Sequence, residues 1–401
     1  MTIQRGYKTE LRLNNKQRTL CLKSAGVARF AYNWGLRIKQ DEYKATGKSP
    51  SAIDLHKRLN VLKKTDFPWM YDVSKCAAQE ALRNLDKAFE NFFRRVKAGE
   101  TPGYPKFKSK KRGVGSFRMT GAIHVTATHI QLPRLGTLRL KETGYLPTDA
   151  KILAATVSEK AGRWFVSIQV EEERPQPMQN NAVCGVDVGI SALATLDNGT
   201  QFENPKALSQ LQEQLKRLQK RVSRKVKGSQ NRKKAVKRLA RLHYRIACVR
   251  KDAIHKATTT ITKSFGVIGI EDLNVSGMVK NHSLAGAISD ASFAEFHRQL
   301  AYKADWTGGQ VIKADRFFPS SKTCSACGMK KDDLKLADRL FVCTHCGLTL
   351  NRDVNAALNL KHVTASSAGI NARRDGKVQP SGGGRQRSEK KTPDKVYVLF
   401  G

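Results

Sequence analysis

The sequence predicts a multidomain α/β protein, mainly because of three short acidic segments. GVDVGI at 185–190 and GIEDL at 269–273 each place a carboxylate within or directly after an apolar run that is typical of a buried strand. NRDVNAALN at 351–359 places Asp353 at the start of a short helix whose apolar residues would pack inward. A helical stretch and a set of short alternating strands precede these segments. The 401 residues are enough for two to four domains with a sizeable core.

The N-terminal half begins with a strand and continues as helices. Residues 6–13 alternate in polarity, whereas residues 15–97 carry apolar side chains at spacings of three and four. Proline and glycine break a basic loop, GETPGYPKFKSKK at 99–111. Residues 117–170 then read as short strands, with HVTATHIQL at 124–132 as one of them. We expect the first strand and this later set to close one small barrel, with the helices inserted between its first two strands.

The second half follows a polar linker at 171–181. Its expected elements are, in chain order, a three-stranded meander over 182–203, a basic helical hairpin over 209–264 that turns near Gly228, a strand over 265–270, a helix over 290–306 and a strand over 311–317. From about residue 373 the chain is polar, glycine-rich and basic, which predicts a disordered tail.

The carboxylates of Asp187, Glu271 and Asp353 indicate a metal site. An unpaired carboxylate in an apolar strand is costly, so three that converge are expected to hold cations. Oxygen ligands with open positions suit Mg²⁺ or Mn²⁺. Two such ions about 3.5–4 Å apart would activate a water and stabilise the leaving oxygen in phosphodiester cleavage. Taken singly, each acid can instead be a surface or helix-capping residue.

Four of the eight cysteines form a metal-ligand pattern. The pair Cys324 and Cys327 and the pair Cys343 and Cys346 are separated by fifteen residues, and a glycine follows each pair. This spacing predicts one closed, structural Zn²⁺ site, with two disulfides or a redox motif as the alternative. The other cysteines are scattered singly, and without a signal peptide we expect reduced thiols in a cytoplasmic protein.

The charge balance indicates a polyanionic partner. Lysine and arginine number 73 against 34 acids, which gives a net charge of +39. Such a charge repels itself in the folded state unless nucleic acid neutralises it. A membrane surface is the alternative partner, but the sequence offers neither an amphipathic anchor nor an apolar run of roughly 20 residues.

The motifs carry a family resemblance. A strand aspartate, a strand-end glutamate and a helix aspartate follow the plan of RNase H-like nucleases. Together with FPSSKTCSACG, CTHCG, RFAYNWGL, FENFFRRVK and GYPKFKSKK, they make the sequence similar to TnpB proteins over nearly its whole length. TnpB proteins are transposon-encoded RNA-guided nucleases related to the ancestors of type V CRISPR effectors.

The resemblance implies a domain order. It implies an α/β RNase H-like (RuvC) nuclease domain at 181–319 and 349–372, with an inserted zinc ribbon at 320–348 that binds target nucleic acid. It also implies an N-terminal OB-like wedge β-barrel at 1–14 and 106–180, which carries a helical recognition lobe at 15–105. The tail at 373–401 has no counterpart in the resemblance.

The resemblance also assigns residues. It makes Asp187, Glu271 and Asp353 the catalytic ligands of two Mg²⁺ (or Mn²⁺) ions, and the four clustered cysteines the ligands of one Zn²⁺. Lys75 and Gln79 fall where relatives contact a short motif beside the target. Further nucleic-acid contacts are expected from basic residues of the loop and the hairpin: Lys106, Lys108, Lys110, Lys111, Arg112, Lys220, Arg221, Arg224, Lys225, Lys233 and Lys234.

The function implied is that of an RNA-guided DNA endonuclease, monomeric within a ribonucleoprotein in a prokaryotic cytoplasm. A guide RNA would pair with one strand of a double-stranded DNA target, and the protein would hydrolyse DNA phosphodiesters. Three alternatives stay open: a transposase-type strand transferase, which uses the same acid geometry, a non-cleaving RNA-guided DNA-binding regulator, and a CRISPR-associated descendant with a separately processed guide.

Overall fold

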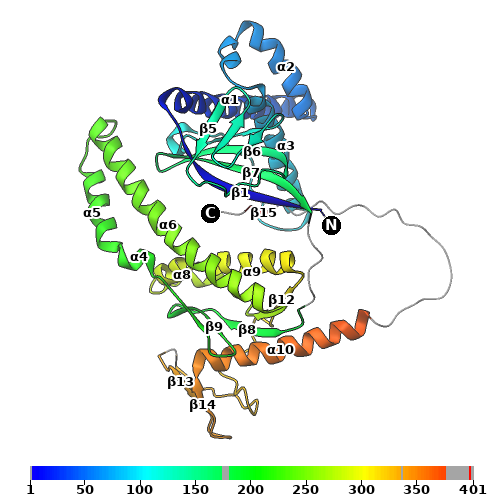
Figure 1. Ribbon diagram of the computed structural model, residues 1–401, viewed down its shortest axis with the longest axis vertical. Helices are drawn as coiled ribbons and strands as arrows, with labels where there is room; N and C mark the ends of the chain where they lie inside the picture. The colour runs from blue at the N-terminus through cyan, green and yellow to red at the C-terminus, as the bar shows by residue number, and fades with distance from the viewer. Residues whose placement is uncertain (1, 174–179, 336, 376–396, 399–401) are drawn as a thin grey trace, which may run out of the picture. The chain divides into compact units, whose positions relative to one another are not determined.

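The computed structural model describes residues 2–173, 180–335, 337–375 and 397–398 (Figure 1). The chain divides into two compact units, Met1–Arg174 with Thr392–Gly401 and Pro175–Lys391. Each unit has its own hydrophobic core. Within the described ranges, every helix is too short or too polar to cross a bilayer.

The helices of the first unit follow strand β1 (Thr2–Arg12) and confirm the helical pattern read over 15–97. They are α1 (Asn15–Thr46), α2 (Ala52–Thr65), the 3₁₀ turn η1 (Pro68–Asp72) and α3 (Lys75–Lys97). Capping boxes at Asn14 and Ser51 satisfy the first backbone amides of α1 and α2. Gly35 lets α3 approach α1, because a Cβ there would lie 2.6 Å from Leu82 Cδ2.

The strands of the first unit form one sheet around β1. After the 3₁₀ turn η2 (Lys110–Arg112) come β2 (Ser116–Met119), β3 (His124–Val125), β4 (His129–Leu132), β5 (Gly136–Leu140), β6 (Lys151–Lys160), β7 (Arg163–Glu173) and, near the C-terminus, β15 (Tyr397–Val398). The order is β2-β6-β7-β1-β5-β4-β3, and β15 pairs with β1 in parallel. The first strand therefore pairs with strands that follow the helices, as predicted.

The single strand predicted over HVTATHIQL is wrong. The segment folds as a hairpin, in which β3 and β4 pair antiparallel. Thr126 and His129 close its turn: the Thr126 amide donates to the His129 carbonyl at 2.9 Å, and the His129 amide donates to Thr126 Oγ1 at 3.1 Å. A threonine hydroxyl that satisfies a nearby amide offers the backbone a turn in place of an extended ladder.

The second unit is built on a five-stranded sheet of mixed direction. Its strands are β8 (Val183–Asp187), β9 (Ala192–Leu196), β10 (Gln201–Glu203), β11 (Val267–Ile270) and β12 (Gln310–Lys313), in the order β10-β9-β8-β11-β12. The first three pair antiparallel, which confirms the predicted meander, and β11 pairs in parallel with both β8 and β12. β12 ends earlier than predicted, and Phe317 is 87% exposed.

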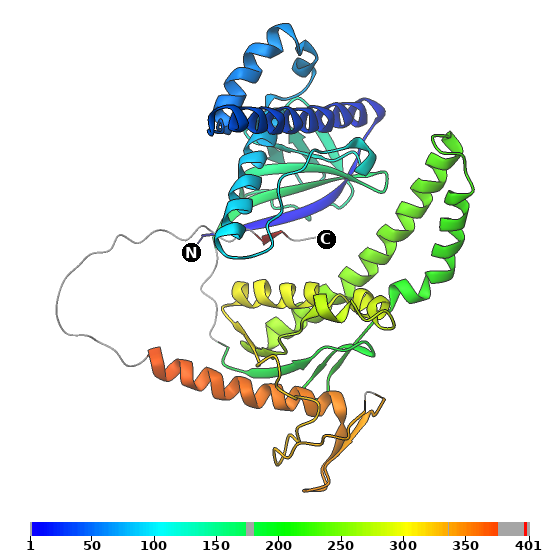
Figure 2. The ribbon, with the colours of Figure 1, turned by 180° about the vertical axis from the view of Figure 1, so that it is seen from behind.

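Helices cover both faces of this sheet. They are α4 (Ala207–Gln210), α5 (Gln212–Ser223), α6 (Gln230–Ser264), α7 (Val275–Met278), α8 (Ala285–Ala291), α9 (Phe293–Thr307) and α10 (Arg352–Asp375). In Figures 1 and 2, α6 and α9 lie on one side of β8 and β9, and α10 lies on the other. The predicted basic hairpin is confirmed as α5 and α6, which share a small core around Leu215, Leu242 and Ile246.

The helix that contains Asp353 is longer than predicted. α10 continues to Asp375, so residues 373–375 belong to a helix and not to a disordered tail. In the sequence, Gly376 comes directly after Asp375 and Pro380 four residues later, and both residue types are common just after a helix. The rest of the predicted tail, 376–396 and 399–401, lies outside the described residues.

Glycines allow α10 to pack directly on the sheet backbone. A Cβ at Gly185 in β8 would lie 1.8 Å from the Ala357 carbonyl oxygen and 2.6 Å from the Lys361 amide nitrogen. A Cβ at Gly269 in β11 would lie 2.0 Å from Thr364 Oγ1. The close approach fixes where α10 begins relative to the ends of β8 and β11.

We predict that Gly185→Ala destabilises the second unit by about 3 kcal/mol, because the clash is with helix backbone that cannot rotate away. Gly286→Ala is the matched control, since a Cβ there has no atom within 4 Å and lies in a helix. The free energy of unfolding of each variant is measured by urea titration, with hydrogen exchange at the amides of β8 and α10 as the local readout. Equal stabilities of the two variants would contradict the packing described.

Candidate functional site

Three carboxylates lie at one end of the sheet of the second unit. Asp187 is the last residue of β8 and is 9% exposed. Glu271 directly follows β11, whose Ile270 is in register with Val186 of β8, so Asp187 and Glu271 leave neighbouring strands together. Asp353 is the second residue of α10, which packs on β8. Glu271 and Asp353 are half-buried.

Within the described ranges, Asp187 is a buried acid without a hydrogen bond or an ion pair from another side chain. Burial raises the pKa of Asp187 well above its ordinary value, and the carboxylates of Glu271 and Asp353 raise it further. The Arg352 guanidinium opposes this shift only in part. The cations that are ion-paired within the described ranges pair with other acids. A bound cation would therefore stabilise the ionised form of Asp187.

The second acid of GIEDL has the opposite environment. Asp272 receives hydrogen bonds from Lys313 Nζ at 3.0 Å and from Arg316 Nη2 at 2.6 Å. These bonds lower the pKa of Asp272. Glu271, in contrast, contributes to the raised pKa of Asp187. Of the two adjacent acids, Asp272 is neutralised by protein cations, whereas Glu271 faces the buried aspartate.

A hydrogen-bond chain connects Glu271 to α10. The Ser320 hydroxyl, which is 2% exposed, donates to Glu271 Oε1. The Ser320 carbonyl accepts from Asn359 Nδ2 at 2.8 Å, and the Thr323 carbonyl accepts from Asn355 Nδ2 at 2.7 Å. Asn355 and Asn359 are one turn apart and fully or nearly buried. The segment before the first cysteine pair is thereby fixed between α10 and Glu271.

An ion pair with a buried aspartate and an exposed lysine connects α10 to β8. Lys361 Nζ of α10 donates to Asp197 Oδ2 at 2.6 Å, and Asp197 Oδ1 accepts from the Gly185 amide of β8 at 3.1 Å. The Asp197 side chain is 6% exposed. The pair holds the strand that ends in Asp187 against the helix that begins at Asp353.

Asp353 borders an open cleft of about 470 Å³. Lys206 and Arg339 contribute positive charge to its lining, Glu203 adds a second acid, and Gln201 and Asn204 contribute polar groups. Asp353 is therefore accessible from solvent through a cleft whose lining carries both signs of charge.

The four cysteines converge as predicted from their spacing. Cys324 and Cys346 have their Sγ atoms 3.6 Å apart, and so do Cys327 and Cys343. All four Sγ atoms lie within 4.8 Å of one another. Tetrahedral sulfurs at about 2.3 Å from one Zn²⁺ would be separated by about 3.8 Å, so the donor set fits that ion.

The carboxylates are more widely spaced than the thiols. Among residues 2–173, 180–335 and 337–375, the cysteines form the one group of three or more His, Cys, Asp or Glu whose ligand atoms all lie within 4.8 Å. Ligands of a two-ion site need not meet that limit, because ligands of different ions can lie further apart than ligands of one ion.

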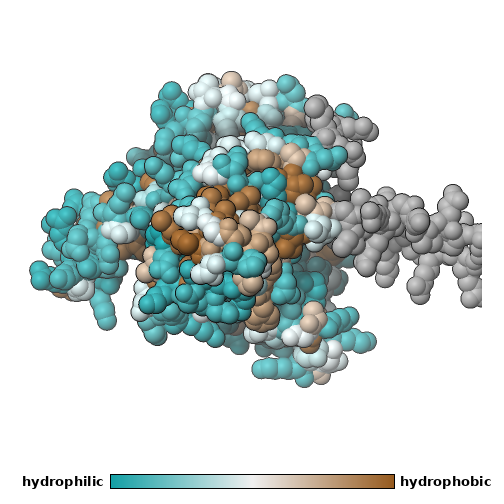
Figure 3. Space-filling model, turned by 90° about the horizontal axis from the view of Figure 1, so that it is seen from below, coloured by the Kyte–Doolittle hydropathy of each residue, from teal (hydrophilic) through white to brown (hydrophobic). Residues whose placement is uncertain are grey.

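Most of the predicted nucleic-acid contacts lie at the surface. Lys75 begins α3 and is exposed, and Gln79 lies one turn later and is half-buried. Arg112 belongs to η2. Exposed side chains are Lys106, Lys108, Lys110 and Lys111 of the loop and Lys220, Arg221, Arg224, Lys225, Lys233 and Lys234 of the hairpin. The left side of Figure 3, where α5 and α6 lie in Figure 1, is almost wholly hydrophilic.

Sequence reasoning missed the residues that position the acids. Ser320 lies within the FPSSKTCSACG motif, where the cysteines drew attention instead. Asn355 and Asn359 repeat at a helical spacing within NRDVNAALN, which was a signal for one polar helix face. No pattern in the sequence pairs Lys361 with Asp197, because the two are 164 residues apart.

Three family descriptions match parts of the chain. A family described as "Probable transposase" (OrfB_IS605) matches residues 155–282. One described as "Cas12f1-like, TNB domain" matches residues 293–360, which include the four cysteines. One described as "Helix-turn-helix domain" matches residues 1–48, which fold here as β1 followed by the single long helix α1.

Two relatives match most of the chain. Proteins of Streptomyces pristinaespiralis and Escherichia coli K12 (InsQ) carry the name "Putative RNA-guided DNA endonuclease". The first is 36% identical over 89% of this chain and 89% of its own length, and the second is 35% identical over 88% and 90%.

The fold is similar to that of a solved Cas12f1–sgRNA–target DNA complex. The TM-score is 0.53 over 87% of this chain and 83% of that chain. With 16% identity, this likeness is one of fold.

The raised pKa of Asp187 predicts a pH-dependent stability. A carboxyl whose folded pKa exceeds its unfolded value binds its proton more tightly when folded, so metal-free stability falls as pH rises above about 4. Asp187→Asn removes the free-energy cost of ionising this buried carboxyl. We therefore expect it to raise the thermal unfolding midpoint at about pH 7, by about 2–4 °C for each kcal/mol of that cost. The difference in unfolding midpoint between the variant and the parent should shrink at about pH 4, where Asp187 is protonated in the parent. It should shrink or reverse when Mg²⁺ is added at about pH 7.

Thermal unfolding of both proteins at the two pH values, with and without Mg²⁺, measures this. A metal-free variant less stable than the parent near neutral pH would contradict the assigned charge environment.

Proposed function

The chain belongs to the TnpB family, and from that premise we propose that it is an RNA-guided DNA endonuclease with Asp187, Glu271 and Asp353 as its catalytic carboxylates. The observation that carries the proposal is the buried Asp187 between two further acids at one end of the sheet. The names of the two relatives support the activity, and their coverage of this chain supports its transfer to the whole protein.

The three acids are proposed to hold two Mg²⁺ or Mn²⁺ ions. Asp187, the most buried of the three, would be the central ligand, and Glu271 and Asp353 would be the flanking ligands. Such ions activate a water and stabilise the leaving oxygen in phosphodiester hydrolysis. The protein's own contribution is to orient the acids: Ser320 fixes the Glu271 carboxylate, and the Lys361–Asp197 pair holds β8 against α10. Carboxylate oxygens fit hard cations of this kind.

The domain roles are proposed along the same lines. Residues 181–319 and 349–372 form the RuvC-like nuclease domain, and the order β10-β9-β8-β11-β12 supports this. Residues 320–348 form the inserted zinc ribbon, in which the four cysteines hold one structural Zn²⁺ with no position left for chemistry. Residues 1–14 and 106–180 form an OB-like wedge barrel with the helices of 15–105 as its recognition lobe. The helices α1–α3 between β1 and β2 in the chain support that assignment.

Nucleic acids are the proposed partners. Base pairing with a guide RNA would select the double-stranded DNA target, while the protein holds backbones and reads a short adjacent motif. The exposed cations of α5 and α6 support backbone contacts, and Lys75 with Gln79 on one face of α3 are proposed to meet the adjacent motif. The complex is proposed to be one protein chain with one RNA, acting in a prokaryotic cytoplasm.

Cleavage of a plasmid library with a randomised adjacent motif tests this function. The chain is expressed with its flanking DNA, and the RNA that co-purifies is sequenced. We expect Mg²⁺-dependent double-strand breaks beside one motif, and a loss of at least about a thousandfold in rate for Asp187→Ala. Asp272→Ala is the matched control, because Asp272 is held by Lys313 and Arg316.

The outcomes separate the alternatives. Breaks made equally by Asp187→Ala and the parent would overturn the site. Joined strand-transfer products would favour the transposase reading, and guided binding without any break would favour the regulator.

Ser320→Ala is predicted to lower cleavage by about 10–100-fold and to raise the Mg²⁺ concentration needed for half-maximal rate, because Glu271 loses the donor that orients it. Ser321→Ala is the matched control: it is the adjacent serine and makes no such contact with Glu271. Tb³⁺ luminescence measures ion affinity apart from turnover. Equal ion affinity and rate in both variants would contradict a positioning role for Ser320.

A further inference from the structure

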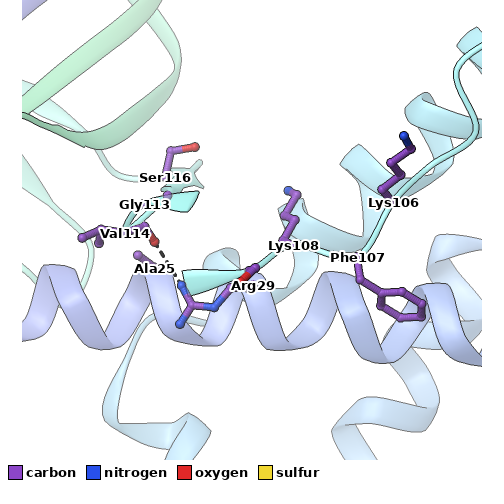
Figure 4. Close-up of a pocket in the computed structure, with 10 residues that line it drawn as sticks. Ala25, Arg29, Lys106, Phe107, Lys108, Gly113, Val114 and Ser116 are labelled. Atoms are coloured by element: carbon purple, nitrogen blue, oxygen red, sulfur yellow. Dashed lines mark hydrogen bonds between the residues drawn. The ribbon is translucent and has the colours of Figure 1, made fainter. Parts of the chain in front are cut away.

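The first unit contains a basic pocket that the nuclease centre does not use. It has a volume of about 310 Å³ and lies between α1 and the loop 106–116 (Figure 4). Ala25 and Arg29 of α1 form one side, and Lys106 and Lys108 are part of the other. The ten described residues that line it include three cations and no acid.

The loop is irregular but held in place by side chains of α1. Asn33 contacts both backbone groups of Lys108: its Nδ2 donates to the carbonyl at 2.9 Å, and its Oδ1 accepts from the amide at 2.8 Å. One turn earlier in α1, Arg29 Nη1 donates to the Val114 carbonyl at 3.1 Å. Both ends of the pocket wall are therefore fixed before any ligand arrives, which lowers the ordering cost of binding.

Lys108 has an unusual place among the lysines of this loop. Its Nζ lies 3.9 Å from the centroid of the Tyr32 ring, and Tyr32 is 6% exposed. Burial lowers the pKa of Lys108. In Figure 4 the Lys108 and Lys106 side chains leave the loop on the same side.

The cations of the pocket have no carboxylate to neutralise them. Among the described residues, the ion pairs involve other lysines and arginines and not Arg29, Lys106 or Lys108. Arg29 uses one N–H on Val114, and a guanidinium carries five. A partly desolvated ammonium and the free edge of a guanidinium at one concave site are the donors that a phosphate accepts from.

We propose that this pocket binds one backbone phosphate of a nucleic-acid strand, with Arg29, Lys106 and Lys108 as its ligands. The proposal rests on the proposed function only in taking nucleic acid as the partner. RNA and DNA share the phosphodiester, so the strand that occupies the pocket is decided by the test. The other lysines of the loop, Lys110 and Lys111, do not line the pocket and contribute only diffuse attraction.

The test measures binding without Mg²⁺, so that no cleavage occurs. The full chain is titrated against a short fluorescein-labelled single-stranded RNA, and separately against DNA of the same sequence, over a range of NaCl concentrations. We expect Lys108→Gln to weaken the binding of one or both strands by about tenfold and to reduce the slope of log Kd against log salt by about 0.7. Lys106→Gln should act in the same direction.

Lys44→Gln is the matched control, because it makes the same charge change at an exposed lysine in the last turn of α1, outside the pocket. It should weaken binding by less than about twofold, and Lys108→Arg should keep most of the affinity. A loss confined to RNA identifies the guide strand as the occupant, and a loss confined to DNA identifies the target.

Equal losses for Lys108→Gln and Lys44→Gln would overturn the pocket and leave only a diffuse basic surface. Absence of cleavage by the parent would sink the proposed nuclease activity, yet the contrast between the two variants would still support the pocket.

Discussion

The second unit depends on one constraint: the Asp187 carboxyl is buried at the end of a central strand between two other acids, and Arg352 offsets their repulsion only in part. Asp187 is 9% exposed, and its two acidic neighbours repel its charge instead of relieving it. Such an arrangement is costly to fold and gains nothing for stability. A bound cation offsets this cost. The low dielectric around Asp187 penalises the free anion, but it also strengthens the attraction between that anion and a cation.

The surrounding structure serves to bring three distant parts of the chain to that point. Gly185 and Gly269 remove the side chains that would keep α10 off the sheet, so Asp353 begins its helix beside the ends of β8 and β11. The Lys361–Asp197 pair and the Asn355–Asn359 face of α10 then fix the helix to β8 and to the segment before the cysteines. α10 is therefore the element that connects the acid site and the cysteine site.

This connection gives the four-cysteine site a role beyond folding of its own hairpin. The backbone between Ser320 and Ser325, which includes Cys324, is held by Asn355 and Asn359. The Ser320 hydroxyl at the start of this segment contacts Glu271. A change at the four-cysteine site would reach Glu271 through a short chain of hydrogen bonds, in which each lost partner leaves an unsatisfied polar group.

The sequence could predict the parts of this site that depend on local pattern. Flanking valines marked Asp187 as a strand residue, and the spacing of the cysteine pairs predicted their convergence. The meander and the basic hairpin followed from alternation and from leucine spacing. Patterns could not predict the contacts that join distant segments, such as Asp197 with Lys361 or Asn33 with Lys108, because the residues involved are ordinary polar residues until the fold brings them together. The length of α10 was missed because its polar composition resembled the tail that follows it.

The central claim is that Asp187, Glu271 and Asp353 hold a pair of hard cations. An anomalous-scattering map from crystals of the chain grown with Mn²⁺ tests it most directly. The account predicts two peaks about 3.5–4 Å apart, both beside Asp187, with Glu271 and Asp353 on opposite sides. Mn²⁺ bound elsewhere on the molecule, with no peak beside Asp187, would contradict it.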